Sequence, residues 1–167
     1  RQHAYLGMAP ARDGDEPRRY LDSGMEWVTP TVAGPAEESD ERSLWKSDPA
    51  EATADVAAYL RHVGADLVVS YDTDGGYGHP DHVRSHEVAK AAAAEVGVPF
   101  AALTAHRELA DKWWDLESYR QQVATALRHH RTQLTVHEDG ATITHSGGQT
   151  ERFITSTGLR GDFPHLP

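Results

Sequence analysis

The apolar positions of the chain alternate between helical spacing and short continuous runs. Residues 49–63 carry apolar side chains three and four positions apart, which predicts an amphipathic helix. Residues 66–71 and 98–104 are short apolar runs of the kind that strands covered on both faces show. The Ala-rich segment 82–96 between them predicts a second helix. This alternation of helices and strands is typical of α/β proteins, so we predict a Rossmann-like parallel sheet flanked by helices.

Capping residues mark the ends of these helices. Asp48 can cap the first helix, Pro49 suits its first position, and Glu51 has the spacing of a capping box. Gly64 ends this helix, as Gly97 ends the second. The apolar stripe of the first helix consists of Val56, Ala57, Leu60 and Val63.

The remaining segments are more polar. Residues 29–48 are rich in Pro, Gly, Ser and acidic side chains, which predicts a mobile, lid-like loop. A third helix is expected over 116–131, and a C-terminal β-hairpin pairs 134–136 with 141–144 across a Glu-Asp-Gly turn. We expect 1–167 to form a single domain, since one core commonly serves such a length.

Composition narrows the possible partners and ligands. The formal charge of -10, without a basic run, argues against nucleic acid and against anionic membrane surfaces. No apolar stretch approaches the ~18 residues of a membrane span, and no signal core precedes the first motif, so we expect a cytoplasmic protein. Without cysteine, a bound metal would be held by His, Asp or Glu. The chain has 11 histidines.

Many polar and ionisable side chains lie in one stretch, YDTDGGYGHPDHVRSHEV (residues 71–88). This stretch follows directly after the carboxyl end of the first predicted strand. Ligands of open parallel sheets bind at that end. Pro80 forces His79 to be extended, and Asp81 is placed to cap a helix from His82, so both imidazoles can face one cavity. The three glycines of the stretch permit a tight turn that leaves Tyr77 projecting.

These residues also have a purely structural interpretation. A Gly-Gly turn followed by Asp-His could be no more than a well-capped helix start, and Asp72 and Asp74 fit the role of turn formers. His86 could share a helix face with His82 as a second ligand, but the Glu that follows the first His of a metalloprotease helix is missing. The pattern alone leaves both interpretations open.

The segment Gly75-Gly76-Tyr77-Gly78-His79-Pro80-Asp81-His82-Val83 resembles the second signature of the LmbE-like, or PIG-L, metal-dependent deacetylases. Asp22-Ser23-Gly24-Met25 resembles a sugar-contacting turn of the mycothiol-pathway members of that family. His130-Arg131-Thr132-Gln133 resembles their later His-x-Thr-Gln segment. The order of the three motifs is kept, and the resemblance extends to about the predicted hairpin.

The resemblance implies a role for four residues of the second signature. His82 would ligate the catalytic metal, Zn²⁺ or Fe²⁺. His79 would steady the oxyanion or protonate the leaving amine, and Tyr77 would help to bind the tetrahedral intermediate. Asp81 would orient an imidazole.

The other two motifs imply substrate contacts. Asp22 and Met25 would touch hydroxyl groups of an amino-sugar substrate, although Met25 could equally be a core methionine. His130 lies on the apolar face of the third predicted helix, three residues beyond Leu127, and could be a hydrogen-bonded interior residue. The implied reaction removes the acetyl group of an N-acetylglucosaminyl-inositol. The alternatives are a mycothiol S-conjugate amidase and a non-catalytic module that binds a sugar or nucleotide.

The family's first signature, an Ala-His-Pro-Asp-Asp-Glu segment with further ligands and the general base, is absent from residues 1–167. One His cannot hold a catalytic ion alone, so we expect this chain by itself to be inactive. We expect it to be the carboxyl-side portion of a longer enzyme. Its leading β-α unit would belong to the same protein or to another chain. A degenerate relative is the alternative.

Overall fold

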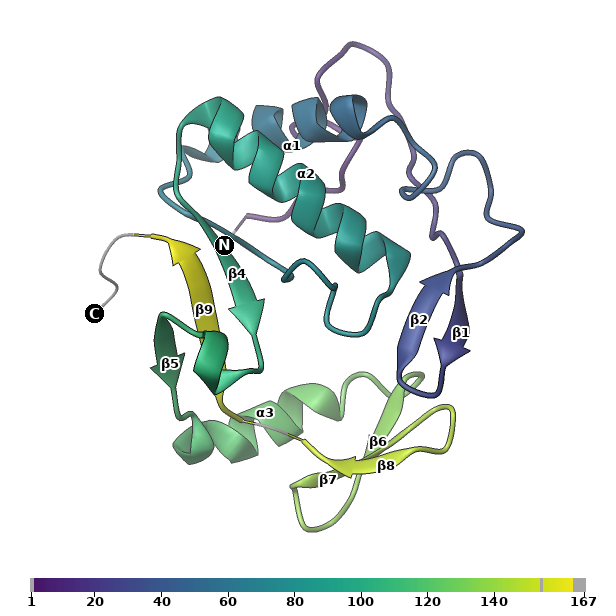
Figure 1. The fold of residues 1–167 in the computed structure, drawn as a ribbon, viewed down its shortest axis with the longest axis vertical. Coiled ribbons are helices and arrows are strands. Elements are labelled where there is room, and N and C mark those ends of the chain that lie inside the picture. Colours follow the sequence, from purple (N-terminus) through teal and green to yellow (C-terminus); the bar gives the residue numbers. More distant parts are fainter. Residues whose placement is uncertain (1, 154, 164–167) are drawn as a thin grey trace. The chain divides into compact units, whose positions relative to one another are not determined.

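The computed structural model describes residues 2–153 and 155–163 and divides into two compact units (Figure 1). The first unit comprises Arg1–Thr104 with Arg160–Pro167, and the second comprises Ala105–Leu159. The last strand, β9, begins in the second unit and ends in the first. The single domain expected over 1–167 stays a prediction.

The elements follow one another in the order that Figure 1 labels. The helices are α1 (Pro49–Val63), α2 (Pro80–Val96) and α3 (Arg120–Leu127), with single 3-10 turns at Arg107–Leu109 and Glu117–Tyr119. The strands are β1 (Met25–Thr29), β2 (Val32–Pro35), β3 (Val68–Ser70), β4 (Phe100–Thr104), β5 (Lys112–Trp114), β6 (Leu134–Val136), β7 (Thr142–His145), β8 (Thr150–Arg152) and β9 (Thr157–Asp162).

The first unit is built on the predicted parallel pair. β3 and β4 run parallel, with Val68 opposite Phe100, and the end of β9 lies on the other side of β4. α1 and α2 pack on each other, and α2 also packs on both strands. The buried core consists of Ala57, Leu60, Val68, Ala92 and Ala93. The mixed α/β fold is thus confirmed, whereas the full Rossmann-like sheet with a missing leading unit stays a prediction.

The ends of α1 lie where the sequence predicted them. The Asp48 carboxylate accepts a hydrogen bond from the Ala50 N–H at 2.9 Å, and Gly64 ends the helix with a φ of +61°. Glu51 differs from the predicted capping box, because its two carboxylate oxygens pair with Arg12 and Arg18 instead. Two cationic partners compensate a carboxylate better than one backbone N–H does.

The prediction that Asp81 caps a helix beginning at His82 is wrong. α2 begins at Pro80, and His79 is its N-cap, with Nδ1 accepting a hydrogen bond from the Asp81 N–H at 3.2 Å. Proline has no N–H to leave unsatisfied and a φ already set for a helix, so it favours the first helical position. Asp81 therefore lies inside the first turn, and its carboxylate is available for another contact.

Part of the predicted loop 29–48 is ordered as a hairpin. β1 and β2 pair antiparallel, with Met25 opposite Pro35 and a register shift between Trp27 and Thr29. Beyond Pro35 the chain returns through turns, and a parallel bridge joins Leu21 to Ser43. The Thr29 hydroxyl accepts the Val32 N–H at 3.1 Å and so closes the hairpin turn. The lid-like mobility of the segment stays a prediction.

The second unit contains the predicted hairpin and a third strand. β6 pairs antiparallel with β7, and β7 with β8. The predicted helix over 116–131 is shorter, because only Val123, Ala124 and Leu127 of α3 find apolar partners, and polar turns follow. In the part of the chain that the structure describes, no helix has the length and apolar character of a membrane span.

Candidate functional site

Ser23 fastens the Asp22 turn to the first turn of α2. Its N–H donates to Asp81 Oδ2 at 3.1 Å, and its hydroxyl donates to the other oxygen of the same carboxylate. The Ser23 hydroxyl also accepts the Trp45 N–H at 3.0 Å, and the residue is 1% exposed. Asp22 closes its own turn by accepting the Gly24 N–H at 2.8 Å. The Asp22 side chain thus stands beside α2, although 58 positions separate Ser23 from Asp81.

The glycines of the 75–78 turn allow two close approaches that no other residue permits. Gly78 has a φ of +86°, and a Cβ there would lie 2.3 Å from the Ala33 carbonyl oxygen. Gly75 has a φ of +61°, and its Cβ would lie 2.8 Å from the Cβ of His82. In return, the Ala33 N–H donates to the Tyr77 carbonyl at 2.7 Å. The turn is therefore fitted between β2 and the start of α2, with Tyr77 at its tip.

The two imidazoles of the signature lie side by side. The rings of His79 and His82 are 4.7 Å apart between centroids at 28°, and Tyr71 stacks on His82 at 4.1 Å. The Tyr77 ring stands edge-on to His82 at 5.3 Å, and Trp27 of β1 lies 6.0 Å from Tyr77. Three separate segments thus supply one cluster of rings around His82.

Hydrogen bonding fixes opposite tautomers for the two neutral imidazoles. His82 Nδ1 lies 3.1 Å from the Gly75 carbonyl, which can only accept, so Nδ1 carries the proton and Nε2 keeps its lone pair. His79 Nδ1 accepts the Asp81 N–H, so a neutral His79 carries its proton on Nε2. In this arrangement His82 offers a lone pair to a metal, whereas His79 offers an N–H. His79 can act as a ligand only if it gives up the hydrogen bond from Asp81.

Ligand-type atoms of Asp22, His79 and Asp81 all lie within 4.8 Å of one another, so these three residues could hold a metal ion. Carboxylate oxygen and imidazole nitrogen suit Zn²⁺ and Fe²⁺ among other divalent metals. His82 belongs to no such group of three among residues 2–153 and 155–163. Its ring is nevertheless next to the group, since it stacks on His79.

Burial raises the pKa of the Tyr77 hydroxyl, and Tyr71 and the Asp22 carboxylate raise it further. Both neighbours disfavour a phenolate, as does the loss of hydration. Tyr77 therefore keeps its proton at neutral pH and acts as a hydrogen-bond donor.

Among the described residues, the other candidates contribute no ligand atom to the Asp22 group. Met25 is half-buried at the start of β1, where it lies opposite Pro35. His86 is buried one turn beyond His82, and its Nδ1 donates to the Tyr71 carbonyl at 2.8 Å, which leaves it outside the Asp22 group. His130 is exposed in the turn after α3, so its interpretation as an interior residue is wrong.

Three further residues belong to the site but were not predicted from the sequence: Ser23, Tyr71 and Trp27. No local sequence pattern predicts that Ser23 bonds to a helix far along the chain, although it lies inside the turn that the family resemblance identifies. Tyr71 is the last residue before the polar loop, where a strand's carboxyl end delivers its side chain to the site. Trp27 could be found only once the β1–β2 hairpin was known.

The chain is similar to curated sugar deacetylases. The chain is 33% identical over 141 residues to a 1D-myo-inositol 2-acetamido-2-deoxy-alpha-D-glucopyranoside deacetylase of Nocardioides sp., which covers 82% of this chain and 45% of that protein. A deacetylase 2 of the same description from Frankia alni is 43% identical over 96 residues, 58% of this chain and 30% of the relative. One from Kineococcus radiotolerans is 50% identical over 68 residues, 41% and 19% of the two chains.

No family model matches the chain. The curated relatives nevertheless confirm the resemblance to the LmbE-like deacetylases, and the chain is a homologue of these inositol-glycoside deacetylases. It spans less than half the length of each of these relatives.

Proposed function

We propose that the chain forms part of a zinc-dependent N-deacetylase that hydrolyses the acetamide of an N-acetylglucosaminyl-inositol. The observation that carries this proposal is the stacked pair of imidazoles with opposite tautomers, placed beside two carboxylates. The names of the relatives support the substrate class. The cytoplasmic location stays part of the proposal.

His82 would hold the ion through Nε2, because its other nitrogen is committed to the Gly75 carbonyl. This arrangement is common for metal-binding histidines, whose second nitrogen donates to a carbonyl or carboxylate that fixes the ring. A bound zinc ion would polarise the amide carbonyl and lower the pKa of a water molecule. The Asp22, His79 and Asp81 group lies beside His82, and its two carboxylates favour a cation there.

His79 and Tyr77 would act on the amide itself. The Nε2–H of His79 would donate to the charge that develops on the carbonyl oxygen. In its alternative role, a protonated His79 would give one proton to the leaving amine and return to the neutral form. The Tyr77 hydroxyl would donate to the same oxygen, as its raised pKa allows. Asp81 would position His79 through its N–H, while Ser23 holds the Asp81 carboxylate in place.

Asp22 and Met25 would contact the hydroxyl groups of the sugar or inositol ring. Asp22 is exposed at the edge of the cluster, with one oxygen bound to Gly24 and the other available. A single histidine does not complete a catalytic zinc site, so we propose that residues 1–167 alone do not turn over. The further ligands and the general base would come from a His-Pro-Asp-Asp segment elsewhere in the protein or on another chain.

The test compares His82→Ala with His79→Ala in the full-length gene product. We expect His82→Ala to weaken zinc binding by more than about 100-fold, since it removes a ligand rather than a supporting contact. His79→Ala should retain the metal but slow acetate release from N-acetylglucosaminyl-inositol by about 10² to 10³. Zinc content by atomic absorption and acetate release by a coupled assay give the two readouts.

Exposed His62→Ala is the control, because it removes an imidazole of α1 whose ring partner is Tyr59 rather than a residue of the site. It should keep both zinc and turnover in the folded fraction. If His82→Ala bound zinc as tightly as the parent, the assignment of the ligand would be wrong. A parent that bound zinc but released no acetate would instead contradict the proposed reaction. If the enzyme turned over a thioether conjugate in preference to the N-acetyl sugar, its function would be that of the S-conjugate amidase.

A further inference from the structure

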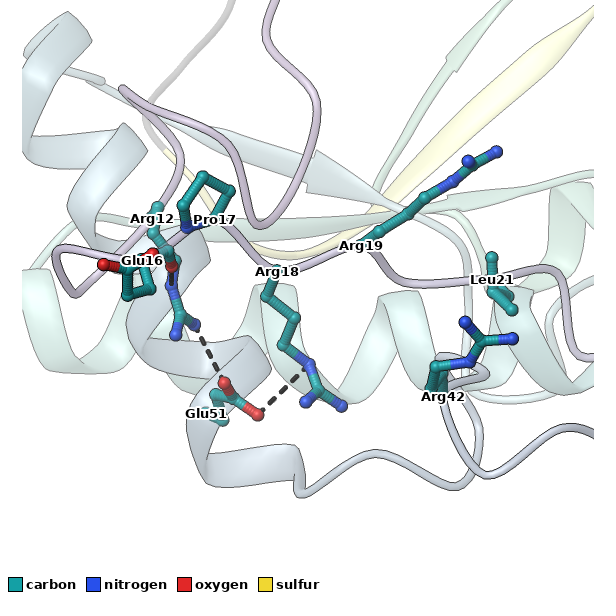
Figure 2. A pocket seen from close by; sticks show the side chains of 8 residues that line it. All are labelled: Arg12, Glu16, Pro17, Arg18, Arg19, Leu21, Arg42 and Glu51. Carbon is teal, nitrogen blue, oxygen red and sulfur yellow. Dashed lines mark hydrogen bonds and ion pairs between the residues drawn. The ribbon is translucent and has the colours of Figure 1, made fainter.

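Four arginines surround a surface hollow of about 540 Å³ in the first unit (Figure 2). The arginine hollow is lined by Arg12, Arg18, Arg19 and Arg42, together with Glu51 and Leu21. Arg12, Arg18 and Arg19 come from the segment before β1, and Arg42 comes from the segment after β2. Its volume lies within the ordinary range of small-molecule sites, roughly 300 to 1,000 Å³.

Arg18 keeps most of its hydrogen-bonding capacity. Its Nε lies 3.2 Å from a Glu51 oxygen, which is its one ion pair with a described residue. Within residues 2–153 and 155–163, the side-chain nitrogens that are both buried and without a hydrogen bond are Arg18 Nε and Arg84 Nε. The two terminal nitrogens of Arg18 must therefore reach solvent. In the view of Figure 2 the Arg18 guanidinium lies between Glu51 and Arg42.

Arg42 and Arg12 are each held by a carboxylate that leaves a terminal nitrogen unused. Asp40 binds Nε and Nη2 of Arg42 at 3.1 and 3.0 Å, and no described residue binds its Nη1. Glu51 and the buried Asp55 bind Nη1 of Arg12, and Nη2 has no partner among the described residues. These ion pairs fix the guanidinium groups in place before any ligand arrives.

The acidic partners are shared unevenly among the four arginines. Glu51 pairs with Arg12 and with Arg18 at once, so one negative charge orients two positive ones. Arg19 is exposed at the edge and forms no ion pair with any described residue, which adds a further unbalanced charge. Glu16 is the other acidic residue in the lining.

We propose that the arginine hollow is a binding site for a phosphate group. Guanidinium forks match the tetrahedral oxyanion, and several preoriented N–H donors can reach one phosphate. The site goes beyond the proposed deacetylation, in which the acetamide carries no anionic group. The ligand is either inorganic phosphate or the phosphate of a phosphorylated small molecule, and the two sources share the same contacts.

The experiment titrates inorganic phosphate into the 167-residue chain by calorimetry, at constant ionic strength with sodium chloride as the matched salt. Phosphate should bind with saturation, whereas chloride should not. Arg42→Gln should weaken phosphate binding by about threefold to tenfold, as the loss of one charge-assisted hydrogen bond does. The double variant R18Q/R42Q should show no saturable binding.

Arg61→Gln is the matched control, because it removes a similar exposed charge whose ion pair with Glu95 lies outside the hollow. It should bind phosphate as the parent does. Glycerol 3-phosphate then identifies the source: tighter binding than inorganic phosphate assigns the site to a phosphorylated metabolite, and equal binding assigns it to the free ion. Absence of saturable binding by the folded parent, or undiminished binding by R18Q/R42Q, overturns the proposal. Arg42→Gln itself is exposed and should leave the fold intact, as circular dichroism can verify.

Discussion

Asp55 of α1 and Asp81 of α2 are both helical carboxylates, but their hydrogen-bonding and ion-pair partners differ. Asp55 is fully buried and accepts from Arg12, from the Asp13 N–H at 2.7 Å and from the Tyr20 hydroxyl at 2.9 Å. Asp81 is half-buried and accepts from the neutral donors of Ser23, beside a second carboxylate and an imidazole. Asp55 is thus saturated and paired with a cation, whereas Asp81 keeps its negative charge unbalanced.

This difference distinguishes a structural carboxylate from one that is available for chemistry. A buried charge that is completely compensated fixes its partners and offers nothing to a ligand. A carboxylate held by neutral donors, next to another acid, attracts a proton or a metal ion. Asp55 therefore anchors the segment that contains Arg12 and Tyr20, and Asp81 belongs to the candidate site.

The largest effect should follow from Asp55→Asn. The substitution leaves the Arg12 guanidinium without its buried partner, and we expect it to lower the free energy of unfolding by about 3 kcal/mol. Urea denaturation followed by circular dichroism measures this change. Glu95→Gln, which removes an exposed partner of Arg61, is the control and should stay within about 0.5 kcal/mol. An equally small loss for Asp55→Asn would show that the network around it is dispensable.

A smaller effect on stability, with a larger one on the site, is expected from Ser23→Ala. The loss leaves the Trp45 N–H and an Asp81 oxygen short of a partner, at a cost of about 1 to 3 kcal/mol. Ser47→Ala is the matched control, because this buried serine donates to the Leu44 carbonyl and touches no site residue. Deacetylation by the full-length product should fall much more in Ser23→Ala than in Ser47→Ala. Equal losses would reduce Ser23 to a packing residue.

The smallest effect concerns Asp139, a carboxylate of the second unit that is also held by neutral donors. The Thr142 hydroxyl, followed by the Ala141 and Thr142 N–H groups, lowers the pKa of Asp139 to about 2. Because the folded pKa is lower than the unfolded value of 3.8, its contribution is complete above that value and is lost as the pH falls toward 2.

In the Asp139→Asn variant, the stability of the β6–β7 hairpin should therefore depend less on pH between about 2 and 3.8. Amide chemical shifts of Ala141 and Thr142 followed by NMR report the titration directly. A midpoint near 3.8 in the parent would mean that neutral donors do not hold this carboxylate charged.

Local structure followed closely from the sequence. The cap at Asp48, the glycine stop at Gly64, the parallel runs and the hairpin after α3 depend on neighbouring residues, and all were predicted. The start of α2 was misplaced by two residues, since Pro80 competes with Asp81 for the boundary. The hairpin β1–β2 was missed, because its Pro and Gly content is typical of loops and its exposed face carries no alternating pattern.

The candidate site was predicted only in part. His79, His82 and Tyr77 share one short segment, so their proximity followed from the sequence, and they lie together as expected. The Asp22 turn was recognised by resemblance, but its position next to Asp81 depends on hydrogen bonds from Ser23 that no local pattern encodes.

What the sequence determined by itself is the helix–strand order and the crowded turn that carries both imidazoles, because short-range sterics and capping fix such features. Only the tertiary structure decided which carboxylate is neutralised and which stays available. It alone gathered Arg12, Arg18 and Arg42 around one hollow in a chain without a basic run. Contacts between segments tens of residues apart depend on how the whole unit packs, and Coulomb interactions act through that final arrangement rather than along the chain.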